Sequence, residues 1–354
     1  MSRYGRDLRF HLVESCPAHR PGILSMRFRF AVFLAATLGT APRVSGAQPT
    51  TPRTTPVLIC GAHEAEIKVD SLTDSVRSCM RHFEAEVMRA QFEHSYITST
   101  SITGSQPRLV FEGNIAPAFS LVTPGKNIAL VMTPKVVMRM FAENSVPVKT
   151  PSYMPRVTAY LFAEPTVKNV RDSTATFMYL TLSHHSNGQS GSFLNPDGSV
   201  NHETGNFSTN FLEYGGLIGG ALGSSSTVTI RSSVEWHPKG WYDDSSNVRY
   251  SHLRGHAGFN FSHRGAHNGN GEWNAISLDV AVTYLSGDVA VPFHGRGRFP
   301  LLANIIYRPS WAREIAYLLS GYWGQDYYNT YFDQTRSMVR IGISAGTING
   351  SFGR

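Results

Sequence analysis

Apolar and polar residues alternate with a period of two through most of the chain, from about residue 107 to its end. One representative segment alternates throughout: Ile276, Ser277, Leu278, Asp279, Val280, Ala281, Val282, Thr283, Tyr284. Successive side chains of a β-strand point to opposite faces, so the alternation predicts strands with one apolar and one polar face. No second region of helical period follows residue 107. We therefore expect an all-β protein.

The predicted strands are long, and Gly, Asn, Asp, Ser and Pro separate them. Eleven can be counted: 107–123, 127–141, 155–164, 173–186, 206–219, 225–237, 249–262, 273–285, 300–308, 312–323 and 335–347. Aromatic residues stand near many of their ends: Trp236, Trp241, Trp273, Tyr307, Trp311 and Trp323. Long two-faced strands with terminal aromatics are typical of an antiparallel transmembrane β-barrel with an apolar outside and a polar interior. A soluble β-sandwich is the alternative, but it favours shorter strands.

Strand number is constrained as well, because closed barrels of this class have an even number of strands. One strand is therefore missing from the eleven or one is split, and the candidates are the regions near 90–100 and 288–298. Residues 107–354 are expected to form the barrel.

Low charge with middling hydropathy agrees with this pattern. Only 16% of the residues are charged, 11% are aromatic, and the mean hydropathy is −0.18. Few charges and many aromatics argue against a disordered chain. The strongly apolar run from Phe30 to Ala41 is too short for a transmembrane helix. A barrel needs only every second residue to be apolar, which an average over the chain conceals.

The first 47 residues resemble a leader rather than part of a fold. Basic residues in 26–29 precede an apolar run in 30–38, and Ser45-Gly46-Ala47 offers small residues at a cleavage site. This order predicts a secretory signal peptide cleaved after Ala47, with either Met1 or Met26 as the start. A short buried helix is the alternative, which Pro42 opposes.

The net charge of +7 is largely a property of this leader. The leader holds seven Arg against one Asp and one Glu, a charge of +5, which leaves +2 for the mature chain. A basic protein suggests a nucleic-acid partner, but most of that charge is lost on cleavage. We expect no nucleic-acid partner.

Residues 48–106 are predicted to be a short N-terminal periplasmic extension. Its first part is rich in Pro and Thr, and residues 74–90 show a helical period. Cys60 and Cys79 are the two cysteines of the mature chain. An even number of cysteines in an exported protein suggests a disulfide, with two free buried thiols as the alternative.

Candidate catalytic residues stand at the end of one predicted strand. His184 and Ser186 share the face that carries Leu182, which on a barrel is the outside. Polar groups at the membrane edge cost free energy, so their presence there suggests a function. Asn210, on the next predicted strand, also shares its face with apolar residues. A Ser nucleophile, a His base and an Asn that orients the imidazole form a working triad. A polar strand end entering a loop is the alternative interpretation.

Four separated stretches resemble a known family, outer membrane phospholipase A. They are His184-His185-Ser186-Asn187-Gly188, Asn206-Phe207-Ser208-Thr209-Asn210, the stretch from Ser145-Val146-Pro147 to Tyr153-Met154-Pro155, and Ser320-Gly321-Tyr322-Trp323-Gly324 with Phe332-Asp333-Gln334-Thr335-Arg336. Each block alone is weakly specific, whereas four in the family's order are not.

The resemblance implies a twelve-stranded barrel in the Gram-negative outer membrane that hydrolyses acyl esters of phospholipids, depends on calcium and is active as a homodimer. It implies Ser186 as nucleophile, His184 as base, Asn210 as the orienting group and the Gly188 N–H as an oxyanion donor. The family's calcium ligands correspond to three positions here: the main chain of Gln189, Asn206, and Ser145 from the partner subunit.

Two departures from the family pattern bear on this expectation. The segment between Ser186 and Asn210 is about twice the family's length, and its insert 195–203 carries alternating oxygen-bearing side chains. The insert could add a calcium ligand, although a Pro-Asp-Gly turn is the simpler interpretation. Pro134 replaces the family's interface Gln, which bears on the mode of dimerisation.

The sequence thus predicts a calcium-dependent phospholipase A1 or A2 of the outer membrane. Two rivals stand beside it. One is a barrel that kept the fold as a structural protein or channel, and the other is a deacylase of a different acyl lipid.

Overall fold

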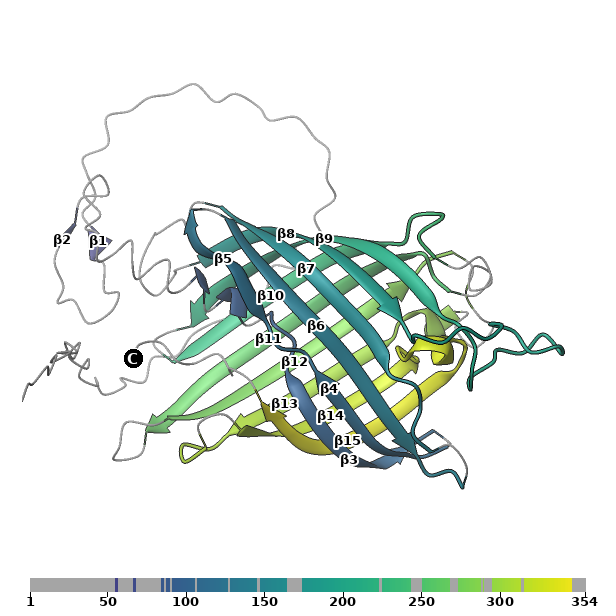
Figure 1. Cartoon of the computed structure of the whole chain (residues 1–354). Helices are drawn as coiled ribbons and strands as arrows, with labels where there is room; N and C mark the ends of the chain where they lie inside the picture. Colours follow the sequence, from purple (N-terminus) through teal and green to yellow (C-terminus); the bar gives the residue numbers. More distant parts are fainter. Residues whose placement is uncertain are drawn as a thin grey trace, which may run out of the picture.

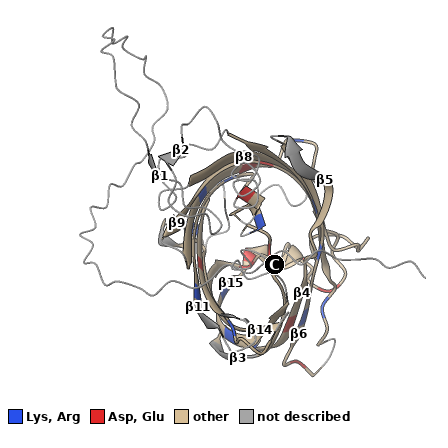
Figure 2. Ribbon diagram, turned by 90° about the vertical axis from the view of Figure 1, so that its left-hand side faces the viewer, with Lys and Arg blue, Asp and Glu red and all other residues tan. Residues whose placement is uncertain are grey.

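Antiparallel strands follow one another around a closed ring, each tilted relative to the barrel axis (Figures 1 and 2). The computed structural model describes residues 55–56, 66–67, 84–85, 87–89 and then 91–345, except 106, 127, 145–146, 164–173, 223–224, 243–249, 268–272, 288, 290–294 and 313–314. Among these residues, no helix is both long and apolar enough to cross a bilayer.

The sheet contains thirteen strands: β3 (Ser95–Gly104), β4 (Leu109–Ile115), β5 (Phe119–Lys126), β6 (Ile128–Phe141), β7 (Ser152–Phe162), β8 (Thr174–Ser186), β9 (Ser208–Leu222), β10 (Ser226–Trp236), β11 (Leu253–His267), β12 (Trp273–Leu285), β13 (Leu301–Arg308), β14 (Ile315–Gln325) and β15 (Thr335–Ala345). Two short 3-10 helices, η5 (Gly295–Arg298) and η6 (Asn329–Asp333), lie outside the sheet. The short strands β1 (Thr55–Pro56) and β2 (Glu66–Ile67) pair with each other.

The ring has twelve positions because β4 and β5 both pair with β6 and together occupy one of them. The sequence pattern predicted a single strand over 107–123, but the chain breaks between Ile115 and Phe119. Pro117 lies in this break, and a proline there removes a backbone donor from the ladder. The expected fold class, an antiparallel barrel of about twelve strands, is confirmed.

The strand missing from the sequence count is β3, which pairs with β15 on one side and β4 on the other. It lies in the region expected to belong to the extension, so the barrel begins at Ser95 rather than at residue 107. The boundary drawn from the sequence is therefore wrong. Cys60, Cys79 and the leader lie outside the described residues.

The two faces of the wall differ as the alternation predicts. Apolar side chains cover the outside, where Ile218 is 58% and Ile230 60% exposed, while inward residues such as Thr229 are buried. Exposed aromatics mark both ends of this apolar band. Trp236 and Trp323 lie at one end and Tyr307 and Trp311 at the other. Apolar outward faces bounded by aromatic girdles are the surface of a membrane barrel.

Buried ion pairs lie on the lumen side of the wall where β3, β4, β6 and β15 meet. Arg139 Nε lies 2.5 Å from Glu112 Oε2, and its Nη1 lies 2.6 Å from Asp326 Oδ1. Arg340 pairs with the same Glu112, and Arg336 Nε lies 3.1 Å from Asp326 Oδ2. These charges have no access to solvent, so each depends on its partners for the solvation it lost on folding.

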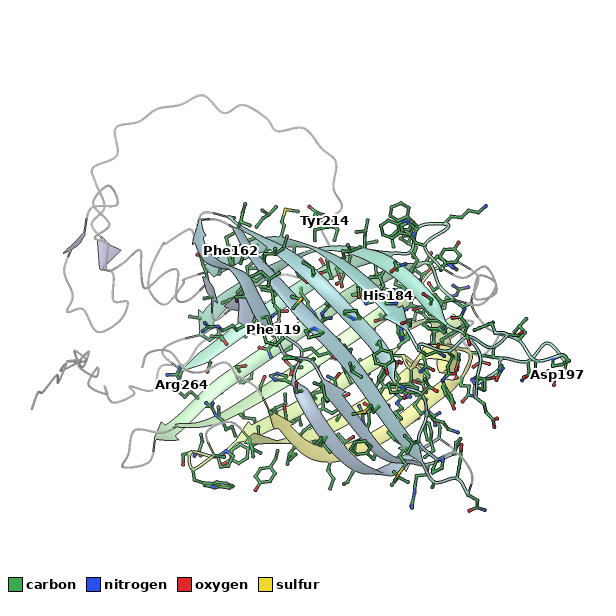
Figure 3. All side chains as sticks on the ribbon, in the orientation of Figure 1. Phe119, Phe162, His184, Asp197, Tyr214 and Arg264 are labelled. Carbon is green, nitrogen blue, oxygen red and sulfur yellow. The ribbon has the colours of Figure 1, made fainter. Side chains whose placement is uncertain are left out.

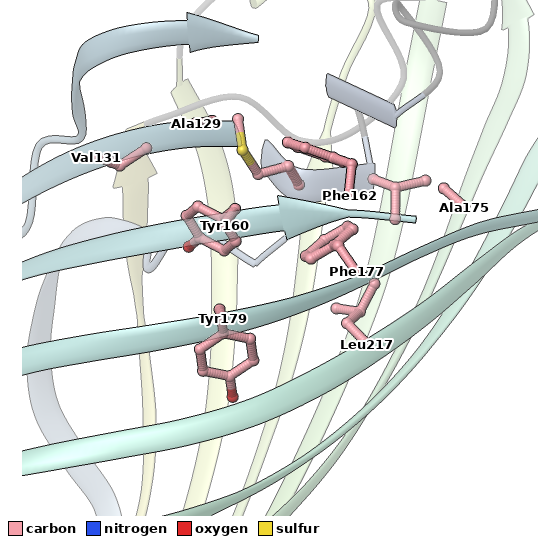
Figure 4. Close-up of a cluster of buried hydrophobic side chains, with 10 residues drawn as sticks. Ala129, Val131, Tyr160, Phe162, Ala175, Phe177, Tyr179 and Leu217 are labelled. Carbon is pink, nitrogen blue, oxygen red and sulfur yellow. The ribbon is translucent and has the colours of Figure 1, made fainter. Parts of the chain in front are cut away.

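The segment before β3 enters the lumen at one end. Helical residues Val87 and Met88 are buried against inward-facing side chains of β6 to β9: Ala129, Val131, Tyr160, Phe162, Ala175, Phe177, Tyr179 and Leu217 (Figure 4). Glu93 fixes the same segment, because it lies 2.6 Å from Lys135 and 3.2 Å from Arg156. The helical period predicted for residues 74–90 is confirmed for the part described, and this part fills the barrel end.

We predict that Arg139→Met destabilises the barrel by about 3–5 kcal/mol, since it leaves the carboxylates of Glu112 and Asp326 buried with fewer partners. Unfolding in detergent, followed by the loss of heat-modifiable gel mobility, measures the effect.

Lys149→Met is the matched control, because Lys149 pairs with Glu143 at 2.5 Å in a partly solvated position. It should cost no more than about 1 kcal/mol. Equal losses in the two variants would contradict a structural role for the buried network.

Candidate active site

Polar side chains form a small group on the outside of the barrel, at the edge of the apolar band. His184 on β8 lies opposite Asn210 on β9, and Ser186 lies opposite Ser208. One row further into the band, Leu182 and Trp236 flank Leu212, and Leu182 is 51% exposed. Figure 3 shows His184 near the barrel end from which the loop with Asp197 projects. The group therefore lies where an apolar surface meets polar loops.

The imidazole of His184 is held in one orientation by Asn210. Its Nδ1 lies 2.8 Å from Asn210 Oδ1. The other end of the amide, Nδ2, donates to the main-chain carbonyl of Trp241 at 3.1 Å. A carbonyl can only accept, so this contact assigns the amide: Nδ2 faces Trp241 and Oδ1 faces the imidazole. Nδ1 must then carry the ring hydrogen, which leaves Nε2 as the basic nitrogen.

Ser186 stands two residues beyond His184 on the same outward face. A β-strand spaces such residues by roughly 7 Å along its axis, and among the residues described no hydrogen bond joins Ser186 Oγ to the imidazole. Catalytic hydrogen bonds are often long in sites without substrate. The structure thus brings together the predicted base and orienting group, with the predicted nucleophile beside them.

A buried amide fixes the chain immediately after Ser186. Asn187 Oδ1 accepts from the N–H groups of Phe207 at 3.0 Å and Gln189 at 3.2 Å, and its Nδ2 donates to the Gly205 carbonyl at 2.8 Å. Gly188 has φ of 68°, in the left-handed region where glycine is favoured. The turn that carries the predicted oxyanion donor is therefore fastened to the start of β9.

The predicted calcium ligands are partly brought together. The Asn206 N–H donates to the Gly191 carbonyl at 2.9 Å, which places Asn206 beside the segment that contains Gln189. Ser145 lies outside the described residues. Main-chain and amide oxygens are ligands that calcium accepts, but it takes six to eight of them. No group of three His, Cys, Asp or Glu residues that could hold a metal occurs in the described part of the chain. The donor set fits calcium in kind and supplies no charge.

The insert folds back on itself as a hairpin. Gly198 N–H donates to the Asn195 carbonyl at 2.9 Å, and Asp197 Oδ1 accepts from the N–H of Ser199 at 2.9 Å. Hydrogen bonds from Ser199 hold the pKa of Asp197 below its ordinary value. The Asp197 carboxylate is thus occupied within its own turn, and the predicted Pro-Asp-Gly turn is confirmed.

The base of the insert covers the barrel mouth beside the site. Phe193, Val200 and Phe207 form one buried cluster with Tyr250 and Phe332. His202 stacks on Tyr331 of η6, with 4.5 Å between ring centroids. The longer segment between Ser186 and Asn210 is therefore an ordered cap on the mouth.

Two contributors to the site were not predicted from the sequence. Asn187 lies in the stretch from His184 to Gly188 that resembles the family. Its position just after a strand could have suggested that its side chain binds main-chain groups of the following loop. The Trp241 carbonyl carries no side-chain signal at all, because any residue could supply it.

Comparisons with known proteins support the fold. The chain matches no known family profile and no curated protein. Its structure is similar to outer membrane phospholipase A from Escherichia coli, with a TM-score of 0.50 and 12% identity over 74% of this chain and 98% of the other. The Salmonella typhi outer membrane phospholipase dimer with bound calcium gives a TM-score of 0.48 and 13% identity over 72% and 91%. At such identity the first likeness shows a common barrel fold, and the second carries no further argument.

We predict that Asn187→Ala loosens the segment 189–206, because two N–H groups and one carbonyl lose their buried partner. Cleavage after Glu203 by a glutamate-specific protease should become at least several-fold faster, measured on the folded protein in detergent.

Asn195→Ala removes an exposed hydrogen bond to Ser199 in the same segment and is the control. It should leave cleavage close to the wild-type rate. Equal protection of the Asn187 variant and the wild type would show that Asn187 does not anchor the segment.

Proposed function

We propose that this protein is an outer-membrane hydrolase of phospholipid acyl esters. The observation that carries the proposal is the His184–Asn210 hydrogen bond at 2.8 Å on the outward face, at the rim of the apolar band. A structural barrel has no need of an oriented imidazole there. A lipid ester sits at the boundary between acyl chains and headgroup, which is the level of this site.

The chemistry follows from the assigned tautomer. Nε2 of His184 takes the proton from Ser186 Oγ as the oxygen attacks the ester carbonyl, and Asn210 stabilises the imidazolium that forms. As the tetrahedral intermediate collapses, the His184 imidazolium donates that proton to the oxygen of the leaving alcohol. Water then releases the fatty acid from Ser186 in a second round of the same steps. The N–H of Gly188 is the proposed donor to the oxyanion.

Calcium is the proposed cofactor. The main-chain carbonyl of Gln189, the side chain of Asn206 and Ser145 of a partner subunit would hold it. The bound ion would supply positive charge near the oxyanion. Ligands from two subunits would make activity depend on a homodimer. Pro134 faces outward on β6, opposite Pro155 of β7, so the proposed dimer face is apolar at this point rather than amide-bonded.

The channel rival is opposed by the contents of the lumen. A cavity of about 460 Å³ remains inside the barrel, lined at one end by residues 91–94 and at the other by Tyr250 and Phe332. Residues 91–94 and two members of the buried cluster at the mouth, Tyr250 and Phe332, thus narrow the lumen from opposite ends. The second rival, a deacylase of another acyl lipid, uses the same site and differs only in substrate. We place the protein in the Gram-negative outer membrane, exported through the predicted signal peptide.

We predict that Ser186→Ala lowers acyl release from phospholipid micelles with calcium by at least about 10³-fold, because the nucleophile is lost. Fatty acid released by the purified protein in detergent is the measurement, repeated with other acyl lipids to separate the second rival.

Ser208→Ala is the matched control, since Ser208 lies directly opposite Ser186 on the same face. It should retain nearly full activity. Equal acyl release by wild type and Ser186→Ala would refute the proposed nucleophile, and no release by the wild type from any lipid would refute the enzyme.

We expect chelation of calcium to abolish acyl release and added calcium to restore it. Asn206→Ala should raise the calcium concentration for half-maximal activity several-fold, since one oxygen ligand of a neutral site is lost. Asn195→Ala, in the hairpin turn of the insert 195–203, should not change that concentration. Activity that survives chelation would contradict the proposed cofactor.

A further inference from the structure

A tight turn after β10 holds Asn210 from outside the barrel; we call its hydrogen bonds to Asn210 the outer contacts. The Trp241 carbonyl accepts from the Asn210 backbone N–H at 2.8 Å as well as from its side chain at 3.1 Å. The Trp241 N–H donates to the Pro238 carbonyl at 3.0 Å, which closes a four-residue turn. Its third residue, Gly240, has φ of 86°, and among the described residues no atom lies within 4 Å of the position that a Cβ would take. This is a type II turn, which favours glycine at that position.

Thr209, the residue before Asn210, is held from inside the barrel by a second chain of hydrogen bonds, which we call the inner contacts. Thr209 Oγ1 lies 2.7 Å from His237 Nδ1, and His237 Nε2 lies 2.7 Å from Glu235 Oε1. Thr209, His237 and Glu235 are all buried. The carboxylate fixes the hydrogen of the ring on Nε2, so the Thr209 hydroxyl donates to Nδ1. Burial lowers the pKa of His237, which favours this neutral form.

The two sets of contacts meet at one place in the chain. His237 directly precedes Pro238, where the turn begins, and its N–H donates to the His252 carbonyl at 2.8 Å. The same short segment thus binds Thr209 through a side chain and Asn210 through a carbonyl. The buried Thr209 has no access to a substrate, so the Thr209–His237–Glu235 arrangement is not a second nucleophilic centre.

We infer that the Gly240 turn and the buried Thr209–His237–Glu235 chain are a positioning device that fixes Asn210 and, through it, the tautomer of His184. The inference rests on the proposed function for its catalytic consequence only. Thr209 and His237 are positioning residues, because neither reaches the outward face. Small displacements of a catalytic group can lower the rate up to about a hundredfold. Weakening the outer or the inner contacts should therefore lower kcat.

The outer contacts are tested by comparing Gly240→Ala with the control Gly287→Ala. Both glycines have φ in the left-handed region, and in the described part of the chain no atom lies within 4 Å of where a Cβ would stand on either. Both lie in loops at the same end of the barrel. The Gly287 carbonyl also accepts a hydrogen bond, from Arg298 at 2.9 Å. We expect Gly240→Ala to lower kcat about tenfold with KM unchanged, and Gly287→Ala to leave both unchanged.

The inner contacts are tested by comparing Thr209→Val with the control Thr158→Val. Each substitution removes a buried hydroxyl from a lumen hydrogen bond, and Thr158 Oγ1 lies 2.8 Å from Thr181 Oγ1, away from Asn210. We expect kcat to fall several-fold for the Thr209 variant alone. Thermal unfolding of the four variants separates positioning from a general loss of stability, which would affect both members of a pair.

An activity-independent measurement completes the test. The ring nitrogens of His184, in protein labelled with ¹⁵N-histidine and identified by their absence in His184→Gln, should show the Nδ1–H tautomer in the wild type. Gly240→Ala and Thr209→Val should shift His184 toward a mixture of tautomers, and the two controls should not.

Unchanged nitrogen signals in both variants, the same shift in the controls, or a wild type without the Nδ1–H tautomer would overturn the inference. A wild type that shows the expected tautomer and its loss in the variants, yet releases no fatty acid, would refute the proposed function and leave the positioning device standing.

Discussion

Closure of the sheet is the constraint on which the rest of this molecule depends. Inside a bilayer no water is present to bind an unpaired backbone N–H or carbonyl, so a strand edge left open there is untenable. Pairing of β3 with β15 joins the first and last strands of the ring and removes that edge. The buried charges of Glu112, Arg139 and Arg340 lie at this seam and tie β4, β6 and β15 together on its lumen side. Hydrogen bonding thus closes the wall, and ion pairing fixes its interior at the same place.

Register in the closed wall then places the candidate site. His184 and Asn210 meet because they are direct partners across β8 and β9, so any slip by one residue would send one of them into the lumen. The loops contribute something different, since Asn187 fastens the turn after Ser186 and the Trp241 carbonyl orients the Asn210 amide. The sheet therefore supplies proximity, and the loops supply orientation.

Period-two alternation was sufficient to predict most strands and the outward face of His184, Ser186 and Asn210. It failed for β3, whose sequence Ser95–Gly104 is rich in Ser and Thr and has too few apolar residues to show two faces. It also merged β4 and β5, because the residues on both sides of the Pro117 break continue to alternate. Contacts made by main-chain atoms, such as the Trp241 carbonyl, leave no trace in residue identity. The hydrogen bond between His184 and Asn210 could be anticipated because both partners are side chains of types that work together.

The outward position of His184 has a kinetic consequence for the proposed reaction. A site on the outer wall, bordered by exposed Leu182 and Trp236, meets its reactant by lateral diffusion in two dimensions. Its occupancy then follows the mole fraction of substrate lipid in the surrounding leaflet rather than any concentration in bulk water. Diluting that lipid with an inert amphiphile would slow turnover even when the total amounts of substrate lipid and of enzyme are unchanged. Composition of the surrounding film thus becomes the variable to which such an enzyme responds.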